Sequence, residues 1–389
     1  MDENTTPGAA RTRRLRRTVL PTAVAALALA AGLAGVQLYN GSEGSGPGTA
    51  PVASGERTPG GWQQTSVPFE KGDITAVAAL DDAQAWAVGY NLKSYDEVEH
   101  VALRWDGTAW KQESTMPDGV FPTALTVTAA DDIWAAGSTL VHWDGKAWTE
   151  VRAAQDPAGR VMPEALASAP DGSVWSAGRA MGMGVKTGVP SIQSWDGTRW
   201  VRHGLPATGK GEVNGIVALS KDDVWAVGTS YAADAESDQE PLALHFDGTT
   251  WTEAELPGTS SHATWLSGLV APSAKDLWAV GGSFTNTGDQ PYALHYDGKA
   301  WKKTATPDVP DGRLRAVGQA ANGSVWAVGG KGSASVGLRW DEAEHRWQKL
   351  AAPGISARGL GAVPGSSALW AVGIATKGDL VPRIFRFGG

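Results

Sequence analysis

The sequence predicts an all-β protein: a seven-bladed β-propeller, closed by its own N-terminal strand and preceded by one hydrophobic helix. Three observations lead to this prediction, namely the composition, a motif that recurs along the chain, and the fit between the first and last segments. Gly accounts for 50 of 389 residues and Trp for 19, more than Tyr and Phe together, while only 19% of the residues are charged. This composition is typical of many short strands joined by tight turns.

The first sixty residues are predicted to direct the chain across a membrane. Residues 1–17 form a basic segment, and residues 18–38 are an uncharged run rich in Ala and Leu. A run of about 20 apolar residues can span a bilayer, and basic residues before it keep the N-terminus in the cytoplasm. The run is either a cleaved signal peptide or a single transmembrane anchor, the only expected membrane contact. Residues 39–60 are predicted to be a flexible Gly/Ser/Pro linker, and the domain at 61–389 is expected to be extracytoplasmic.

Two motifs recur through residues 61–389. The first, Trp-(Ala/Ser)-(Ala/Val)-Gly, occurs at intervals of 41 to 53 residues and begins at Trp86, Trp134, Trp175, Trp225, Trp278, Trp326 and Trp370. The second follows the first six copies: an aromatic residue, usually followed by Asp-Gly, and then a Trp, as in Trp105-Asp106-Gly107 with Trp110. Tandem units of this length are typical of propeller blades.

Each unit is predicted to contain four strands, here called a to d. Strand a is a small apolar stretch such as residues 74–80, strand b carries the Trp motif, strand c ends at the aromatic residue, and strand d starts at the second Trp. The Asp-Gly between strands c and d suits a hairpin turn with positive φ.

The two ends of the domain complete each other. The seventh unit stops at Phe387-Gly388-Gly389 without a following Trp, whereas Trp62 has no unit of its own. Joining Gly389 to Gly60 places Trp62 five positions after Phe387, the standard spacing of the second motif. The N-terminal strand is therefore predicted to complete the last blade, which leaves no free sheet edge.

These repeats resemble kelch-type repeats, as in the propeller of galactose oxidase-like proteins. The resemblance extends over the whole repeat region, and the paired glycines of kelch units occur at Gly281-Gly282 and Gly329-Gly330. The family implies binding more often than catalysis. The copper cofactor of the oxidase cannot be carried over, because it needs a Tyr–Cys linkage and this chain has no Cys. No cofactor and no metal site are predicted.

Most Trp and His residues are predicted to be structural. Eighteen of the 19 Trp residues fall on the repeat pattern, where large flat side chains would fill the wedges between neighbouring sheets. His142, His245 and His295 share one position, just before the aromatic residue of strand c. Equivalent positions in separate blades point apart around the ring, so a shared zinc site is not expected.

Candidate binding residues lie where the strands a approach the propeller axis. Ten positions before each motif Trp, six of the seven residues are Ala or Gly, as crowded inner strands require: Ala76, Ala124, Ala165, Gly215, Gly268, Ala316 and Leu360. One position earlier the residues are mostly polar: Thr75, Thr123, Glu164, Asn214, Ser267, Arg315 and Gly359. The b–c loops vary in length and share a face with the d–a loops, which makes this face the candidate binding surface.

The residues predicted to contact a ligand are Glu164, Asn214, His262, Trp265, Arg313, Arg315 and Arg358. An ordinary water-filled channel is the alternative for this region. The favoured function is a non-catalytic binding or scaffold propeller that recognises a glycan, peptide or protein. A carbohydrate-active or oxidative enzyme is the alternative function. Nucleic acid is not an expected partner, because residues 61–389 carry 27 basic against 37 acidic residues.

Overall fold

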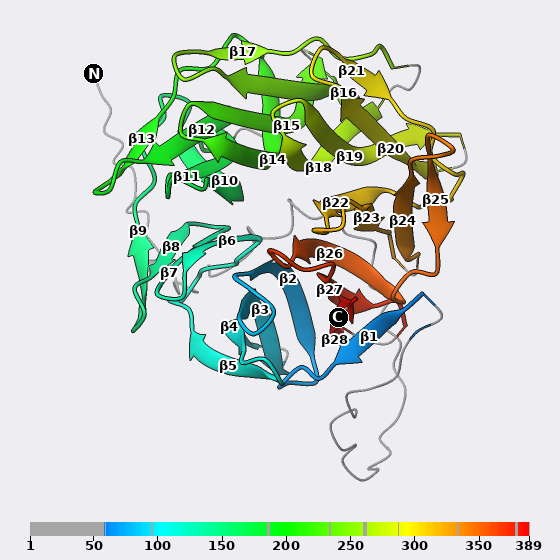
Figure 1. Ribbon diagram of the computed structural model, residues 1–389. Helices are drawn as coiled ribbons and strands as arrows, with labels where there is room; N and C mark the ends of the chain where they lie inside the picture. The colour runs from blue at the N-terminus through cyan, green and yellow to red at the C-terminus, as the bar shows by residue number, and fades with distance from the viewer. Residues whose placement is uncertain are drawn as a thin grey trace, which may run out of the picture. The chain divides into compact units, whose positions relative to one another are not determined.

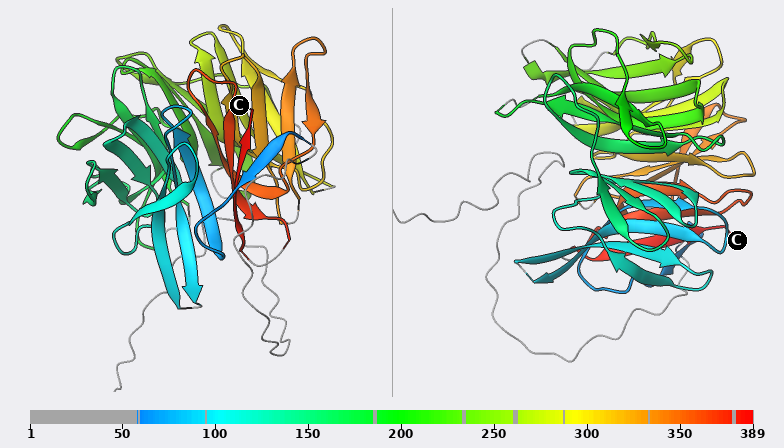
Figure 2. Two further views of the ribbon diagram at one scale, coloured as in Figure 1. Left: turned by 60° about the horizontal axis from the view of Figure 1, so that its bottom comes forward. Right: turned by 90° about the vertical axis from the view of Figure 1, so that its left-hand side faces the viewer.

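A ring of β-sheets around one axis makes up the described part of the chain (Figures 1 and 2). The computed structural model describes residues 58, 60–94, 96–184, 187–232, 235–259, 263–286, 288–332, 334–377 and 380–388. Every regular element among these residues is a β-strand, and within each sequence repeat the strands pair antiparallel from an inner strand near the axis to an outer one. The chain is an all-β propeller.

Five of the sheets have four strands. The first contains β2 (Gly72–Ala79), β3 (Ala85–Ser94), β4 (Glu97–Trp105) and β5 (Trp110–Thr115). The second contains β6 (Ala124–Ala129), β7 (Asp132–Ala136), β8 (Leu140–Trp143) and β9 (Trp148–Val151). The third contains β10 (Arg160–Ser168), β11 (Val174–Met181), β12 (Val189–Trp195) and β13 (Trp200–Arg202). Another contains β22 (Leu314–Gln319), β23 (Val325–Gly329), β24 (Val336–Asp341) and β25 (Arg346–Leu350). The last contains β26 (Ile355–Ala362), β27 (Leu369–Ala375), β28 (Pro382–Phe387) and β1 (Trp62–Thr65).

The remaining eight strands form one continuous sheet. They are β14 (Lys210–Ser220), β15 (Asp223–Ala232), β16 (Ala235–Phe246), β17 (Trp251–Glu253), β18 (Ala263–Ser273), β19 (Asp276–Thr285), β20 (Gly288–Tyr296) and β21 (Trp301–Lys303). A parallel pairing of Gln239 with Ala263 joins β16 to β18. These strands are 12 and 11 residues long, and the pairing joins the fifth residue of β16 to the first residue of β18.

The predicted fold class is therefore wrong in two respects. Instead of seven separate blades, the structure has five four-stranded blades and one eight-stranded sheet, because the pairing between β16 and β18 makes one sheet out of two sequence repeats. The predicted N-terminal helix also lacks support. Residues 18–38 lie outside the described residues, and within the described ranges no helix is found that could cross a membrane.

The N-terminal strand is the outer strand of the last sheet. β1 pairs with β28, and Trp62 lies opposite Phe387, as the spacing of the second motif predicts. The Trp62 side chain is almost completely buried and contacts Phe387 and Trp326, with ring centroids 5.3 Å and 5.9 Å apart. The ring is thus closed by a strand from the opposite end of the chain.

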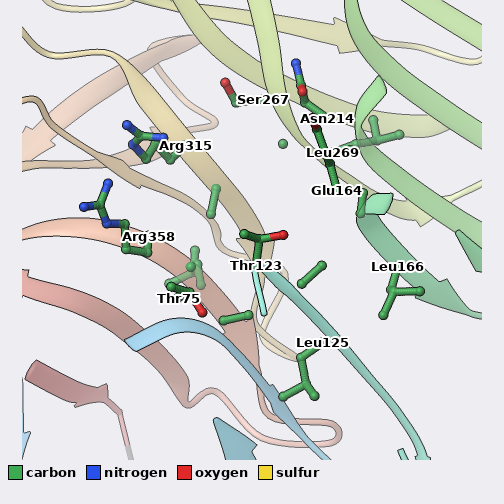
Figure 3. A pocket seen from close by; sticks show the side chains of 18 of the residues that line it. Thr75, Thr123, Leu125, Glu164, Leu166, Asn214, Ser267, Leu269, Arg315 and Arg358 are labelled. Atoms are coloured by element: carbon green, nitrogen blue, oxygen red, sulfur yellow. The ribbon is translucent and has the colours of Figure 1, made fainter. Parts of the chain in front are cut away.

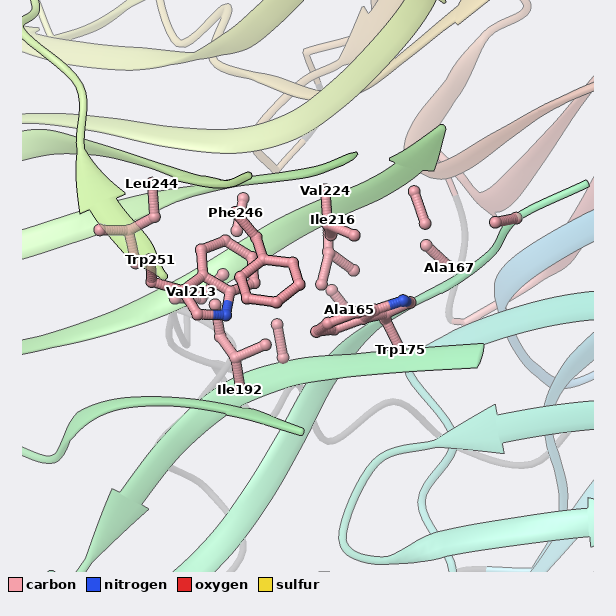
Figure 4. Packing of buried hydrophobic residues seen from close by; sticks show 14 of the residues in the cluster. Ala165, Ala167, Trp175, Ile192, Val213, Ile216, Val224, Leu244, Phe246 and Trp251 are labelled. Atoms are coloured by element: carbon pink, nitrogen blue, oxygen red, sulfur yellow. The ribbon is translucent and has the colours of Figure 1, made fainter. Parts of the chain in front are cut away.

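The hydrophobic core lies between neighbouring sheets. One cluster, shown in Figure 4, joins Trp175 and Ile192 of the third sheet to Val213, Phe246 and Trp251 of the eight-stranded sheet. Strand b is covered on both sides, which explains its continuous apolar sequence. Its Trp packs against the aromatic residues of the neighbouring sheet, as the repeat pattern predicts.

Candidate functional site

The inner strands enclose a cavity of about 210 Å³ on the propeller axis, called here the central cavity. Each repeat contributes three consecutive residues to its lining, all from the inner strand except Thr123, which directly precedes β6. The strands concerned are β2, β6, β10, β14, β18, β22 and β26. The sequence analysis predicted two sets of residues near the axis, ten and eleven positions before each motif Trp. Both sets line this cavity.

A β-bulge places the first lining residue of most inner strands. In β10, for example, Pro163 pairs with Gly178 and Ala165 pairs with Ala177, so Glu164 is the extra residue. The same irregularity occurs in five further inner strands, at Thr75, Asn214, Ser267, Arg315 and Arg358. An extra residue bends the strand and redirects its side chain. The bulges thus place polar side chains next to the small apolar residues that line the axis.

In the last sheet, the lining residues lie one position earlier in the sequence than the spacing to the motif Trp predicts. Ala362 pairs with Leu369, whereas the equivalent Ala79 of the first sheet pairs with Ala85, so this a–b hairpin is one residue longer. The bulge therefore falls on Arg358 and not on Gly359. Gly359 takes the position of a small lining residue and Leu360 the next one. With this correction, every residue at the small position is Ala or Gly.

Two arginines on neighbouring strands form the basic side of the central cavity. Figure 3 shows the guanidinium groups of Arg315 and Arg358 next to each other. Arg358 donates from Nε to the buried Asp73 Oδ2 at 2.9 Å. Burial raises the pKa of Asp73, and the ion pair with Arg358 opposes this shift. Arg358 is thus neutralised by Asp73.

Arg313 lies two residues before Arg315 on the same segment. Its Nη1 is 3.9 Å from Asp289 Oδ2, and Lys331 Nζ is 3.2 Å from the same oxygen. Arg315 pairs with no carboxylate among the described residues, and its buried Nε has no hydrogen-bond partner there. Burial, together with the charges of Arg313 and Arg358, lowers the pKa of the Arg315 guanidinium.

The opposite, acidic side of the cavity carries Glu164, with Asn214 beside it (Figure 3). Arg179 binds two carboxylates at once: its Nη2 lies 3.4 Å from Glu164 Oε1, and its Nη1 contacts Glu212. One guanidinium cannot neutralise two carboxylates. Burial and the neighbouring Glu212 charge therefore raise the pKa of Glu164 to about 8.

The other predicted site residues have different surroundings. Asn214 lines the cavity, and its amide donates to the carbonyl of Leu266 at 3.1 Å. Trp265 and Arg313 are not among the lining residues. A Cβ added at Gly282 would meet Trp265 at 2.5 Å and Arg313 at 3.0 Å, so both side chains lie over this glycine. His262 lies outside the described residues.

The three equivalent histidines occupy structural positions, as predicted. Each contacts an Asp that lies at or near the start of strand b in the same sheet, at 2.6–2.9 Å, and stacks on the motif Trp. The pairs are His142–Asp132, His245–Asp223 and His295–Asp276. Within the described ranges, no group of His, Asp and Glu side chains has the arrangement of a metal site.

Sequence reasoning missed the ion pairs that distinguish these charged residues. Asp73 and Asp289 neutralise part of the basic side, and Arg179 holds Glu164 and Glu212 together. Asp73 and Arg358 are 285 positions apart in the chain. Spacing to the motif Trp gives no signal for this pair, because Arg358 lies at the bulge of β26 whereas Asp73 lies two residues before the bulge of β2.

Comparisons with known proteins identify the fold. No family model and no curated protein matches the chain. Among solved structures, it is similar to a catalytically inactive virginiamycin B lyase from Staphylococcus aureus, with a TM-score of 0.60 and 12% identity over 84% of this chain and 98% of that one. It is also similar to YCF48 bound to D1 peptide, with a TM-score of 0.55 and 14% identity over 86% and 98% of the two chains.

A third similar structure is the WD40 β-propeller domain of Doa1, with a TM-score of 0.56 and 13% identity over 84% of this chain and 97% of that one. Identities this low indicate a shared fold and leave activity undetermined. The three proteins differ in what they bind or catalyse, and their shared feature is the propeller. The comparisons and the topology therefore agree that this chain is a β-propeller.

Proposed function

We propose that this chain is an extracytoplasmic, non-catalytic propeller that binds a peptide or protein through the face that carries the b–c and d–a loops. The loops of this face contact one another: Gly72, at the start of β2, donates to the carbonyl of Leu380 in the loop between β27 and β28 at 2.6 Å. The basic segment and apolar run at the N-terminus support the location outside the cytoplasm. The kelch-like repeat pattern supports binding.

The observation that carries the proposal is the position of the exposed apolar side chains. Of the five large apolar side chains exposed in the described part of the chain, four lie on b–c hairpins of four different repeats: Val98, Met183, Phe284 and Leu380. These side chains belong to the first, third, fifth and seventh repeats, so they are spread around one face as separate apolar contact points, which an extended peptide or a protein surface can reach together. A rigid scaffold with variable loops also suits this role.

Peptide binding is better supported than an enzymatic function. Glu164 and Glu212 are the two acids that a glycosidase-like mechanism would use, and both bind Arg179. That arrangement suits a charge network more than a pair of carboxylates on opposite sides of a sugar. YCF48, which has a similar fold, is described in complex with a peptide.

Selection from a random peptide library tests the proposal. Peptides that bind the purified chain are measured against Met183→Ser and Phe284→Ser, which alter the b–c hairpins. Val201→Ser is the matched control, because Val201 is also exposed but lies on the outer strand β13. We expect each hairpin variant to weaken binding about tenfold, since a buried apolar side chain contributes about 1.5 kcal/mol or more, and the control to leave it unchanged. Equal losses in all three variants, or binding only to a glycan array, would contradict the proposal.

A further inference from the structure

Arg315 carries a charge that the described part of the protein does not neutralise. Three of the surrounding charged groups are paired, since Arg358 binds Asp73 and both Arg313 and Lys331 face Asp289. Arg315 has neither an ion pair nor a hydrogen bond from its Nε among the described residues. At the bulge of β22, Arg315 lies near the charges of Arg313 and Arg358 and also near those of Asp73 and Asp289, but both carboxylates already bind other cations.

An unpaired and largely buried guanidinium is unfavourable for folding. Arginine cannot escape this cost by losing its proton, because its pKa is too high even after the downward shift caused by burial. Neutral residues at equivalent bulges, such as Thr75 and Ser267, show that the fold does not require a charge there. A group that weakens the free protein in this way is typical of a site that a ligand completes.

The geometry around Arg315 suits a carboxylate. Arg315 and Arg358 project from neighbouring bulges into the same cavity (Figure 3). Two planar guanidinium groups side by side offer forked donors that match the two oxygens of a carboxylate. The cavity volume, about 210 Å³, accommodates a small group and not a folded domain.

We propose that Arg315 and Arg358 form a subsite for a carboxylate group of the bound peptide, either an acidic side chain or a free C-terminus. This inference rests on the proposed function, because it names the part of the peptide that enters the central cavity. Arg358 retains Asp73 as its partner and contributes its remaining donors. Arg315 contributes the charge that the described protein leaves unpaired.

Small carboxylates test the subsite without any knowledge of the peptide. The purified chain is titrated by calorimetry or NMR with propionate, with N-acetylglutamate α-amide as a model of an acidic side chain, and with N-acetylalanine as a model of a C-terminus. Inorganic phosphate at the same ionic strength is the competing anion. We expect one of the two model compounds to bind more tightly than propionate and phosphate, which identifies the source of the carboxylate. Phosphate binding as tight as that of every carboxylate would overturn the assignment.

The Arg315→Gln variant separates a binding role from a structural one. We expect it to weaken binding of the preferred model compound at least tenfold and to leave the melting temperature unchanged or higher, because an unpaired charge is removed. Arg199→Gln is the control, since Arg199 is highly exposed at a c–d turn. A lower melting temperature with unchanged binding would show that Arg315 is structural. Arg358→Gln is unsuitable as the test, because it leaves Asp73 buried without its partner.

The two proposals fail in different ways. If selected peptides depend on the b–c hairpins but bind Arg315→Gln as well as they bind the natural chain, the carboxylate subsite is wrong and the binding face stands. If a model carboxylate binds through Arg315 but no peptide is selected, the subsite stands and peptide recognition is wrong.

Discussion

Glu164 and Arg315 occupy equivalent bulges on β10 and β22, and each lies close to a charge of its own sign. Glu164 shares Arg179 with Glu212, while Arg315 lies close to Arg313 and Arg358. Burial disfavours the charged form of both side chains. The consequences differ, because the carboxyl group can take up a proton near neutral pH and the guanidinium stays charged.

Replacing Glu164 by Gln is expected to stabilise the fold at alkaline pH. The pKa of Glu164 is raised from 4.5 to about 8, so between these values the folded protein binds more protons than the unfolded chain. Stability therefore falls as the pH rises through this range. Gln does not titrate, so the variant lacks this decline in stability. We expect its free energy of unfolding to exceed that of the natural chain by an amount on the order of 2 kcal/mol at pH 8 and to change little at pH 5. Urea unfolding at both pH values measures the difference.

The control for this prediction is Glu253→Gln, an exposed carboxylate on the outer strand β17. It removes the same charge from the chain without touching the cavity. An equal gain at pH 8 in both variants would mean that net charge, and not the environment of Glu164, is responsible.

The glycine at the end of each strand-b motif is explained by the close approach of the inner strand, which has a bulge at this point in six of the seven repeats. A methyl group at Gly228 would lie 2.0 Å from the carbonyl oxygen of Glu212, and one at Gly281 would lie 1.9 Å from that of Trp265. The same close approach occurs at every motif copy, namely at Gly89, Gly137, Gly178, Gly228, Gly281, Gly329 and Gly373. The repeated Gly is thus required by the bend of the inner strand that delivers a side chain to the cavity.

Gly228→Ala is expected to destabilise the protein by about 3 kcal/mol, because the added methyl group must push the carbonyl of Glu212 away. The displaced strand also moves Asn214 at the cavity. Gly258→Ala is the matched control, since a methyl group there meets no atom within 4 Å. Denaturant midpoints of the two variants test the prediction, and an equal midpoint for both would contradict it.

Across the whole molecule, each motif Trp joins its own sequence repeat to the aromatic pair of the neighbouring repeat. Trp225 packs on Trp301 at 5.8 Å, and Trp370 of the last sheet packs on Trp105 and Trp110 of the first, at 5.0 Å and 5.1 Å. At the closure, Trp326 meets Trp62 and Phe387. Only at this last contact does the pair come from opposite ends of the chain.

Trp62→Ala is expected to lower stability by about 4 kcal/mol, the cost of removing a fully buried aromatic side chain. The unfolding rate should also rise more than in Trp301→Ala, which removes the equivalent Trp from β21, an outer strand that follows its partner β20 directly in the chain. The reason is that β1 comes from the opposite end of the chain, so loss of its Trp opens the ring, whereas a short turn joins β21 to its partner β20. Stopped-flow unfolding of both variants measures this, and equal rates would contradict a closing role for β1.

Much of the fold could be predicted because the repeats are local in sequence. Strand order within a repeat, the aromatic contacts and the small residues at the axis all follow from spacing to the motif Trp. The same spacing placed Glu164, Asn214 and Arg315 at the cavity. The spacing failed at Arg358. The a–b hairpin of the last sheet has one extra residue, which shifts the inner strand relative to the motif Trp and leaves the motif itself unchanged.

The sequence by itself determined which segments become strands, since apolar patterning and turn residues act between near neighbours. Only the tertiary structure decided how those strands combine. The pairing of Gln239 with Ala263 merges two repeats into one sheet, because it depends on how far two strand ends extend in space. In the same way, Asp73 pairs with Arg358, and Arg315 has no ion pair among the described residues, because charge balance depends on distances across the closed ring and not on position in the chain.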